Sequence, residues 1–317
     1  MVNDYRELEN GISLIDSGYV KPGVAAFYAM VESGGAAFFD TGTSRSVPRA
    51  VEFLDSHHLR PEDVDYVIPT HVHLDHAGGA GAMMRVFPNA QLVVHPRGAR
   101  HMINPERLIQ GTISVYGNEK TAALYGEIIP VPEDRVIIAA DGFELEFRSR
   151  RLQFLDTPGH ARHHFCVFDL NYRGLFSGDT LGIAYPAFTT GNGPFLFPTT
   201  TPPQFEPEAL HASIDRLAAL DPRRVYLTHF GPITPTPPLV TGLHRHLDRF
   251  VELAKEVADQ DQPANLLERS IGEYLFEAAK QHGCQLADAA IWDGLATDVT
   301  LNAQGIEVWL ERRSSSA

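Results

Sequence analysis

The chain has 317 residues, of which 44% are apolar and 21% charged, values typical of a globular protein. Lys and Arg number 26 against 40 Asp and Glu, so the formal net charge is −14, which disfavours nucleic acid or an anionic membrane as a partner. Apolar runs fall far short of the roughly 18 residues that span a bilayer. The length allows two domains, or one large domain with an appendage.

The two cysteines, Cys166 and Cys284, are too few for a disulfide framework, which favours a reducing compartment. The N-terminus lacks the basic-then-apolar order of a signal peptide, so we expect a cytoplasmic protein, with a periplasmic location left open. The unusual number is 15 His, because histidine is the commonest metal ligand among side chains.

The first 200 residues mix strand and helix patterns. Short alternating apolar runs separated by Gly-rich turns predict strands over the first 40 residues. Helices are then predicted at 47–57 and 79–87, strands at 64–69 and 91–95, and short helices in a covering loop over 97–133. Strands are predicted again at 135–139, 143–147, 152–155, 167–169 and 174–177. Residues 185–207 are expected to form a long ordered loop.

Toward the C-terminus the pattern becomes helical. A helix at 208–220 and a strand at 224–228 precede helices at about 241–260, 264–281 and 286–296, and a closing strand at 305–310. A Pro-rich stretch ends at residue 238. We therefore expect a main domain over 1–238 and a helical extension over 239–317, which either caps a pocket of that domain or packs beside it.

The sharpest local signal lies between residues 70 and 76, where His71, His73, Asp75 and His76 follow a predicted strand. In an extended segment, residues two apart point the same way, so His71 and His73 can reach one metal together. If the chain then turns into a helix, Asp75 and His76 face a second point nearby. The alternative is a surface loop that is merely rich in histidine.

Other predicted strands also end in residues that bind metals. Four further strand ends lead into such residues, namely Asp40, His160, Asp179 and His229. Because function usually resides on loops at strand ends, several such ends predict one converging site.

These residues resemble the metallo-β-lactamase superfamily: His-x-His-x-Asp-His, followed by a distant His, Asp and His. The resemblance covers roughly residues 10–235 and implies a four-layer αβ/βα sandwich with a dinuclear metal site at one edge. It places His71, His73 and His160 on the first metal. It places Asp75, His76 and His229 on the second, with Asp179 as a bridge. Asp40 would orient ligands from behind.

The residue at the bridging position distinguishes branches of the family. An Asp at this position, here Asp179, is similar to what the glyoxalase II, lactonase and RNase Z branches have. The net charge of −14 disfavours the RNase Z branch. One departure is His163-His164, which stands where many relatives have Gly-Ser. A glutathione-specific assignment is weakened because the tail shows no obvious basic cluster.

Further candidates lie outside the ligand set. His164 could hydrogen-bond behind a ligand. His95 is either a pocket residue or a packed core histidine. Tyr185 either donates to a developing oxyanion or anchors a loop. His211 and His244 lie on predicted helices, where a surface position is favoured.

The sequence therefore predicts a dinuclear metal-dependent hydrolase in which a metal-bridging hydroxide attacks an ester, thioester or lactone, with Asp75 as the catalytic residue that orients it. The expected cofactors are two divalent ions, with zinc preferred and iron or manganese as alternatives. The expected partner is a small-molecule substrate, and a homodimer stays open. The alternatives are a phosphodiesterase or phosphotriesterase of the same fold, and a non-enzymatic metal- or ligand-sensing protein.

Overall fold

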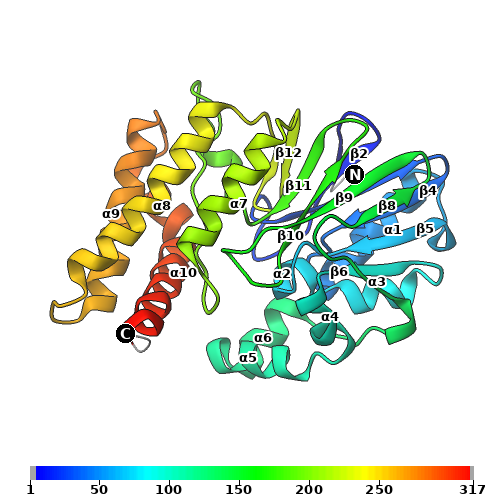
Figure 1. Cartoon of the computed structure of the whole chain (residues 1–317), viewed down its shortest axis with the longest axis horizontal. Helices are drawn as coiled ribbons and strands as arrows, with labels where there is room; N and C mark the ends of the chain where they lie inside the picture. The colour runs from blue at the N-terminus through cyan, green and yellow to red at the C-terminus, as the bar shows by residue number, and fades with distance from the viewer. Residues whose placement is uncertain (1–4, 315–317) are drawn as a thin grey trace. The chain divides into compact units, whose positions relative to one another are not determined.

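Two compact units make up the computed structural model, which describes residues 5–314 (Figure 1). The first contains residues up to Asp156 together with His163–Gly178 and Pro222–Pro232. The second contains Thr157–Arg162, Asp179–Asp221 and the chain from Ile233. The domain boundary at residue 238 stays a prediction.

Seven strands form the first sheet of the first unit, in the order β1-β2-β3-β4-β5-β6-β7. Neighbouring strands are antiparallel from β1 to β4 and parallel from β4 to β7. The strands are β1 (Tyr5–Glu7), β2 (Ile12–Asp16), β3 (Ala26–Glu32), β4 (Gly35–Phe39), β5 (Val64–Ile68), β6 (Gln91–Val94) and β7 (Val136–Ile138).

The second sheet has six strands in the order β13-β12-β11-β10-β9-β8. Its strands are β8 (Glu144–Phe147), β9 (Arg150–Asp156), β10 (Phe165–Asp169), β11 (Gly174–Gly178), β12 (Arg224–Leu227) and β13 (Gly231–Ile233). The strands β11 and β12 run parallel, so the segments that follow them leave the sheet at the same edge. Asp179 and His229 therefore follow strands that end side by side.

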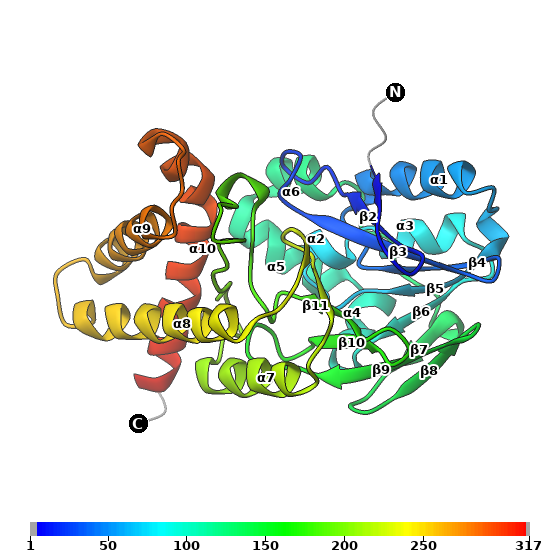
Figure 2. The same cartoon turned by 90° about the horizontal axis from the view of Figure 1, so that it is seen from above.

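Alternation along the strands builds the two cores of the first unit. Tyr28 and Phe39 face the second sheet, where the ring of Phe39 stacks on Phe176 at 3.6 Å between centroids. Phe27 and Phe38 face the other way, toward α1 (Val47–Ser56) and α3 (Ala80–Val86). Figure 2 shows these two helices on one side of the first sheet and the second sheet on the other. The mixed α/β sandwich fold is thus confirmed.

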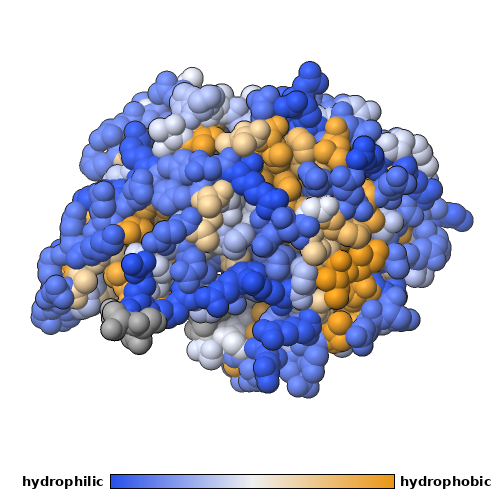
Figure 3. Space-filling model, viewed as in Figure 1, coloured by the Kyte–Doolittle hydropathy of each residue, from blue (hydrophilic) through white to orange (hydrophobic). Residues whose placement is uncertain are grey.

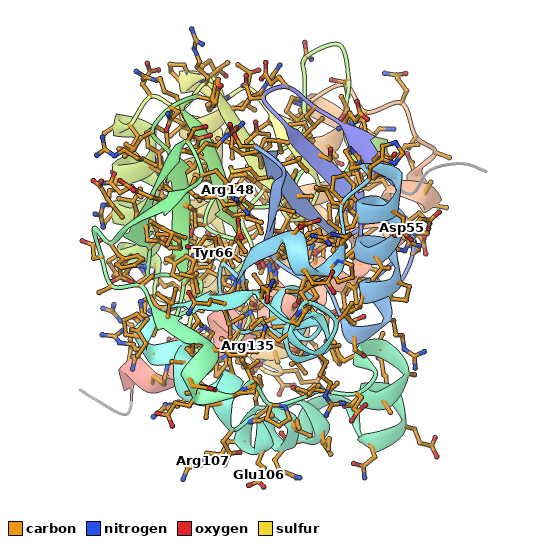
Figure 4. The ribbon with its side chains drawn as sticks, turned by 90° about the vertical axis from the view of Figure 1, so that its right-hand side faces the viewer. Asp55, Tyr66, Glu106, Arg107, Arg135 and Arg148 are labelled. Carbon is orange, nitrogen blue, oxygen red and sulfur yellow. The ribbon has the colours of Figure 1, made fainter. Side chains whose placement is uncertain are left out.

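Short helices carry the connections of the first unit, as predicted for residues 97–133. They are α2 (Leu74–Ala77), α4 (Pro96–Ile103), α5 (Glu106–Tyr116) and α6 (Asn118–Tyr125), with 3₁₀ turns at Ser44–Ser46, Pro61–Asp63 and Glu133–Arg135. Arg135, labelled in Figure 4, donates to the carbonyl oxygens of Met84 and Phe87 at 2.6 Å each. Its guanidinium thereby satisfies carbonyls that the end of α3 leaves open.

Helices dominate the second unit: α7 (Pro207–Ala219), α8 (Pro237–Val257), α9 (Pro263–Gln281) and α10 (Asp288–Ser314), with a 3₁₀ turn at Pro186–Phe188. The strand predicted at 305–310 is wrong, because α10 continues through it. Ala303, Ile306 and Trp309 are spaced by three residues and are all buried on one face of α10. Burial of this face stabilises the helix more than the β-propensity of the residues in between favours a strand.

Hydrophilic residues predominate on the face shown in Figure 3, in keeping with the acidic composition. Among residues 5–314, no helix combines the length and the apolar character that crossing a membrane would require.

Candidate metal centre

The histidine motif occupies the turn between β5 and α2. His73 has extended backbone angles (φ −64°, ψ 148°), and α2 begins at the next residue. The turn is tied to the loop after β4, because Thr41 N–H donates to the His76 carbonyl at 2.7 Å and Gly79 N–H to the Gly42 carbonyl at 3.0 Å. The strand end and the loop thus fix the directions in which the motif's side chains point.

Asp40 lies behind the motif with only 2% of its surface exposed. Its Oδ1 accepts from Thr70 N–H at 2.7 Å and from the Thr70 hydroxyl at 2.9 Å. Its Oδ2 accepts from the Thr228 hydroxyl at 2.6 Å and from His76 Nδ1 at 3.0 Å. The backbone of Asp40 is left-handed (φ 58°), a conformation that is uncommon outside glycine and that these four bonds hold in place.

Asp75, His76 and His229 form one group whose ligand atoms all lie within 4.8 Å of one another. The Nδ1–H of His76 donates to Asp40, and that of His229 donates to the Val24 carbonyl at 2.9 Å. Both rings therefore direct their Nε2 lone pairs inward, where these atoms are 3.3 Å apart. Asp75 Oδ2 lies 3.4 Å from His229 Nε2 and 3.8 Å from His76 Nε2.

His71 and His73 form a second pair in the first unit. His71 Nε2 lies 2.9 Å from His73 Nδ1. The other nitrogen of His71, Nδ1, is 3.2 Å from the Thr70 hydroxyl oxygen, whose own hydrogen goes to Asp40. His71 Nδ1 is therefore the protonated nitrogen, and its Nε2 is free of hydrogen and can bind a metal.

His164 packs against this pair and is completely buried. Its ring stacks on that of His71 with 4.8 Å between centroids. Gly178 (φ 48°) makes room for it, because a Cβ there would lie 2.5 Å from His164 Nε2 and 2.6 Å from the Thr70 hydroxyl oxygen. The contact supports the predicted place of His164 behind a ligand, and its role stays a prediction.

Within the second unit, His160 Nε2 and Asp179 Oδ2 are 3.3 Å apart. His160 Nδ1 lies 3.2 Å from the Thr199 carbonyl oxygen, which fixes Nδ1 as the protonated nitrogen. Nε2 is again left as the atom that can bind a metal. Asp179 follows Gly178, the last residue of β11, directly.

Two of the remaining candidates have structural contacts. Tyr185 donates its hydroxyl hydrogen to Asp298 Oδ1 at 3.2 Å, which ties the 185–207 segment to α10. His95 lies at the N-terminus of α4, where its Nδ1 accepts from Arg97 N–H at 3.1 Å and its Nε2 lies 2.9 Å from Asp156 Oδ1. Their roles at the site stay predictions.

The sequence analysis missed three residues near the motif. Thr70 and Thr228 both donate to Asp40, and the signal was the repeated Thr-His pair at two strand ends, Thr70-His71 and Thr228-His229. His101 is the third, with its ring 6.4 Å from that of His163. Burial lowers the pKa of His101, and the nearby Arg100 and Arg107 lower it further.

Comparison with known proteins places this chain in a family. Residues 20–229 match the model of the metallo-beta-lactamase superfamily. The metallo-beta-lactamase fold-containing protein ST1585 of Sulfurisphaera tokodaii is 27% identical over 234 residues, covering 71% of this chain and 80% of that protein. The hydroxyacylglutathione hydrolase of Aeromonas hydrophila is 29% identical over 167 residues, covering 52% of this chain and 48%, or about half, of that enzyme.

Solved structures agree with the sequence matches. The crystal structure of ST1585 superposes with a TM-score of 0.64 at 25% identity, covering 94% of this chain and 98% of that one. A metallo-beta-lactamase family protein of Thermus thermophilus, TTHA1429, shares the fold with a TM-score of 0.67 at 22% identity, over 96% of this chain and 94% of that one. The family model spans well over half of the sequence, and the chain belongs to the metallo-β-lactamase superfamily.

Proposed function

We propose that this protein is a dinuclear metal-dependent hydrolase of carboxylic esters, thioesters or lactones. The observation that carries the proposal is the group formed by Asp75, His76 and His229. Two ring nitrogens whose neighbouring N–H groups donate elsewhere face each other at 3.3 Å, with a carboxylate oxygen beside them. Three acceptors that converge in this way repel one another unless a shared proton or a metal cation lies between them, and the family favours the metal.

The donor atoms fit divalent transition metals. Imidazole nitrogens and carboxylate oxygens together suit zinc, with iron or manganese as alternatives, and do not favour calcium. His71, His73 and His160 would hold one ion, and Asp75, His76 and His229 the other, with Asp179 shared. Bound there, the pair supplies water activation and polarisation of a substrate oxygen.

The chain's own residues orient the histidine rings and accept a proton. Asp40 holds the tautomer of His76 directly and that of His71 through the Thr70 hydroxyl. Carboxylates behind ligating histidines commonly have this role. Asp75 has 21% of its side chain exposed, whereas that of His76 is completely buried. Asp75 Oδ2 is thus placed to accept a proton and pass it to solvent, which suits a residue that orients the nucleophile.

Similarity favours an acyl substrate over a phosphoester. The hydroxyacylglutathione hydrolase that matches half of this chain is named for an acylglutathione substrate. Because the match covers about half of that enzyme, we do not assign its glutathione leaving group to the substrate of this chain. We therefore propose an acyl-transfer substrate with an unassigned leaving group. We also propose a cytoplasmic location, because the chain has only two cysteines and both are buried.

The test combines metal analysis with a substrate panel. After reconstitution with Zn²⁺ and dialysis, the double variant with Asp179→Ala and His71→Ala should hold close to two fewer ions per chain than wild type. A panel of thioesters, lactones, carboxylic esters and phosphodiesters should show turnover in the first three classes. One ion or fewer lost in the double variant would reject the dinuclear centre. Turnover of phosphodiesters alone would reject the acyl substrate.

A further inference from the structure

A second histidine cluster joins two helices of the second unit. His211 and Asp215 lie one turn apart on α7, and His244 and Asp248 lie one turn apart on α8. Each histidine contacts the carboxylate of the other helix. His244 Nε2 lies 3.0 Å from Asp215 Oδ1, and His211 Nε2 lies 3.1 Å from Asp248 Oδ1. We call these four residues the crossed His–Asp cluster.

The two rings of the crossed His–Asp cluster face each other through their remaining nitrogens. His211 Nδ1 and His244 Nδ1 are 2.6 Å apart, and the rings are nearly parallel at 9° with centroids 4.9 Å apart. Each Nε2 needs its hydrogen for a carboxylate, so each neutral ring presents an Nδ1 lone pair to the other. Two lone pairs at this distance require either a shared proton or a metal ion between them.

We propose that the crossed His–Asp cluster is a binding site for an imidazole-preferring divalent transition metal, of which Zn²⁺ is the probe. Ligating histidines almost always donate their other N–H to a carboxylate, a backbone carbonyl or water, and here both rings have a carboxylate in that place. The ion takes both Nδ1 lone pairs, and the shared proton leaves to solvent. For a tetrahedral ion with Zn–N bonds of about 2.0 Å, the two nitrogens separate to about 3.3 Å.

The surroundings allow such an ion to enter and to complete its coordination. The side chains of His211 and His244 are 27% and 21% exposed, so small ring rotations meet no packed core. His244 and Asp248 also line a cavity of about 480 Å³ between α8 and α9, from which water can supply further ligands. Arg245 and Arg249 line the same cavity. Arg249 is neutralised by Glu252 at 3.1 Å and Glu256 at 2.8 Å.

The experiment compares metal counts in matched variants. Wild type, His211→Gln, His244→Gln and His57→Gln are dialysed against Zn²⁺ at neutral pH, and bound zinc is measured per chain. His57 is the control because its Nε2 also faces a carboxylate, Glu7 at 3.8 Å, whereas its Nδ1 lies 2.9 Å from the Phe53 carbonyl oxygen rather than from a second histidine. We expect wild type and His57→Gln to bind one more ion than either cluster variant. Asp215→Asn should weaken that ion's affinity 10- to 100-fold.

The difference between variants separates this site from the proposed catalytic centre. If the catalytic centre binds fewer than two ions, all four totals fall together and the difference of one remains. Zn²⁺ should also raise the Tm of wild type further than that of His211→Gln, while Mg²⁺ should raise neither. Equal zinc counts in wild type and both cluster variants, with circular dichroism showing native folds, would mean that the two rings share only a proton and would overturn the proposal.

Discussion

The two histidine clusters of this protein differ in how their side chains are held. In the first unit, His71 and His76 are buried at the end of a strand, and a single carboxylate, Asp40, receives hydrogen bonds from both sides of the motif. In the second unit, His211 and His244 sit partly exposed on helices, opposite carboxylates that are 64% and 73% exposed, respectively. Burial makes the first cluster rigid, whereas solvent leaves the second free to adjust.

The two clusters differ in how far folding prepares their side chains to bind a metal. In the first unit, folding has already buried His71 and His76 and fixed their tautomers, so little reorganisation would be needed for a metal to bind. In the second unit, the hydrogen bonds fix tautomers too, but exposed ion pairs contribute only about 0–1 kcal/mol each. The first cluster suits catalysis, and the second suits a weaker, exchangeable ion.

Removal of metal should have the largest effect and should separate the clusters most clearly. Dialysis against a chelator should lower hydrolysis at least on the order of 10³-fold, because water activation and polarisation are worth several kcal/mol of the barrier. Initial rates before and after zinc is restored measure this. His211→Gln should show the same loss and the same recovery, since its cluster takes no part in the chemistry. Unchanged turnover in metal-free protein would contradict the proposed function.

Alkaline pH should destabilise the first unit, because a buried tyrosine there resists ionisation. Burial raises the pKa of Tyr226 to about 12, with Glu9 and Asp169 adding to the effect. The folded state thus keeps a proton that the unfolded state releases above pH 10. Stability present below pH 10 is therefore lost as pH rises toward 12, by about 3 kcal/mol for this group. Urea unfolding of wild type and Tyr226→Phe at pH 9 and pH 11 measures the loss.

Tyr172 provides the control for that experiment, because it lies in the same unit with 43% of its surface exposed. Tyr172→Phe should retain the alkaline loss of stability, whereas Tyr226→Phe should reduce it. The same pH dependence in both variants would mean that burial of Tyr226 is not its cause.

Substitution of Asp40 tests whether the first cluster depends on its buried anchor. Asp40→Asn keeps the shape but replaces one acceptor oxygen by a donor, so at least one of the four hydrogen bonds is lost. We expect metal affinity to fall 10- to 100-fold. Competition with a chromogenic chelator measures it. Asp156→Asn, at the His95 pair of the same unit, should leave the affinity unchanged. Equal affinities in wild type and Asp40→Asn would show that the ligands orient themselves.

The smallest effect is expected in the second unit without metal. Asp248→Asn removes an exposed partner of His211, and the free energy of unfolding should change by no more than about 1 kcal/mol. Urea denaturation in the presence of a chelator measures this. A loss above about 2 kcal/mol would mean that the crossed His–Asp cluster is as fixed as the buried one, and the contrast between the two units would disappear.

Sequence patterns were sufficient for the fold and for the motif because both have local signatures. Alternation assigned the strands, and the motif at residues 71–76 resembles the metallo-β-lactamase superfamily when it is taken together with the distant His160, Asp179 and His229. The strand predicted at 305–310 shows the limit of such patterns. A short run with Ile306 and Val308 satisfies β-propensity, yet α10 buries Ile306 and Trp309 on one helical face.

What the sequence by itself determined is the order of residues that can bind metal and the strands that deliver them. Only the tertiary structure decided which ring nitrogen carries the hydrogen in His76 and His229. His76 is oriented by Asp40, 36 residues away, and His229 by the Val24 carbonyl, 205 residues away. Likewise, two His-x-x-x-Asp turns are visible in the sequence, but only the packing of α7 against α8 brings His211 to His244. Hydrogen-bond partners remote in sequence leave no periodic signal, because the chain between them can vary without changing the contact.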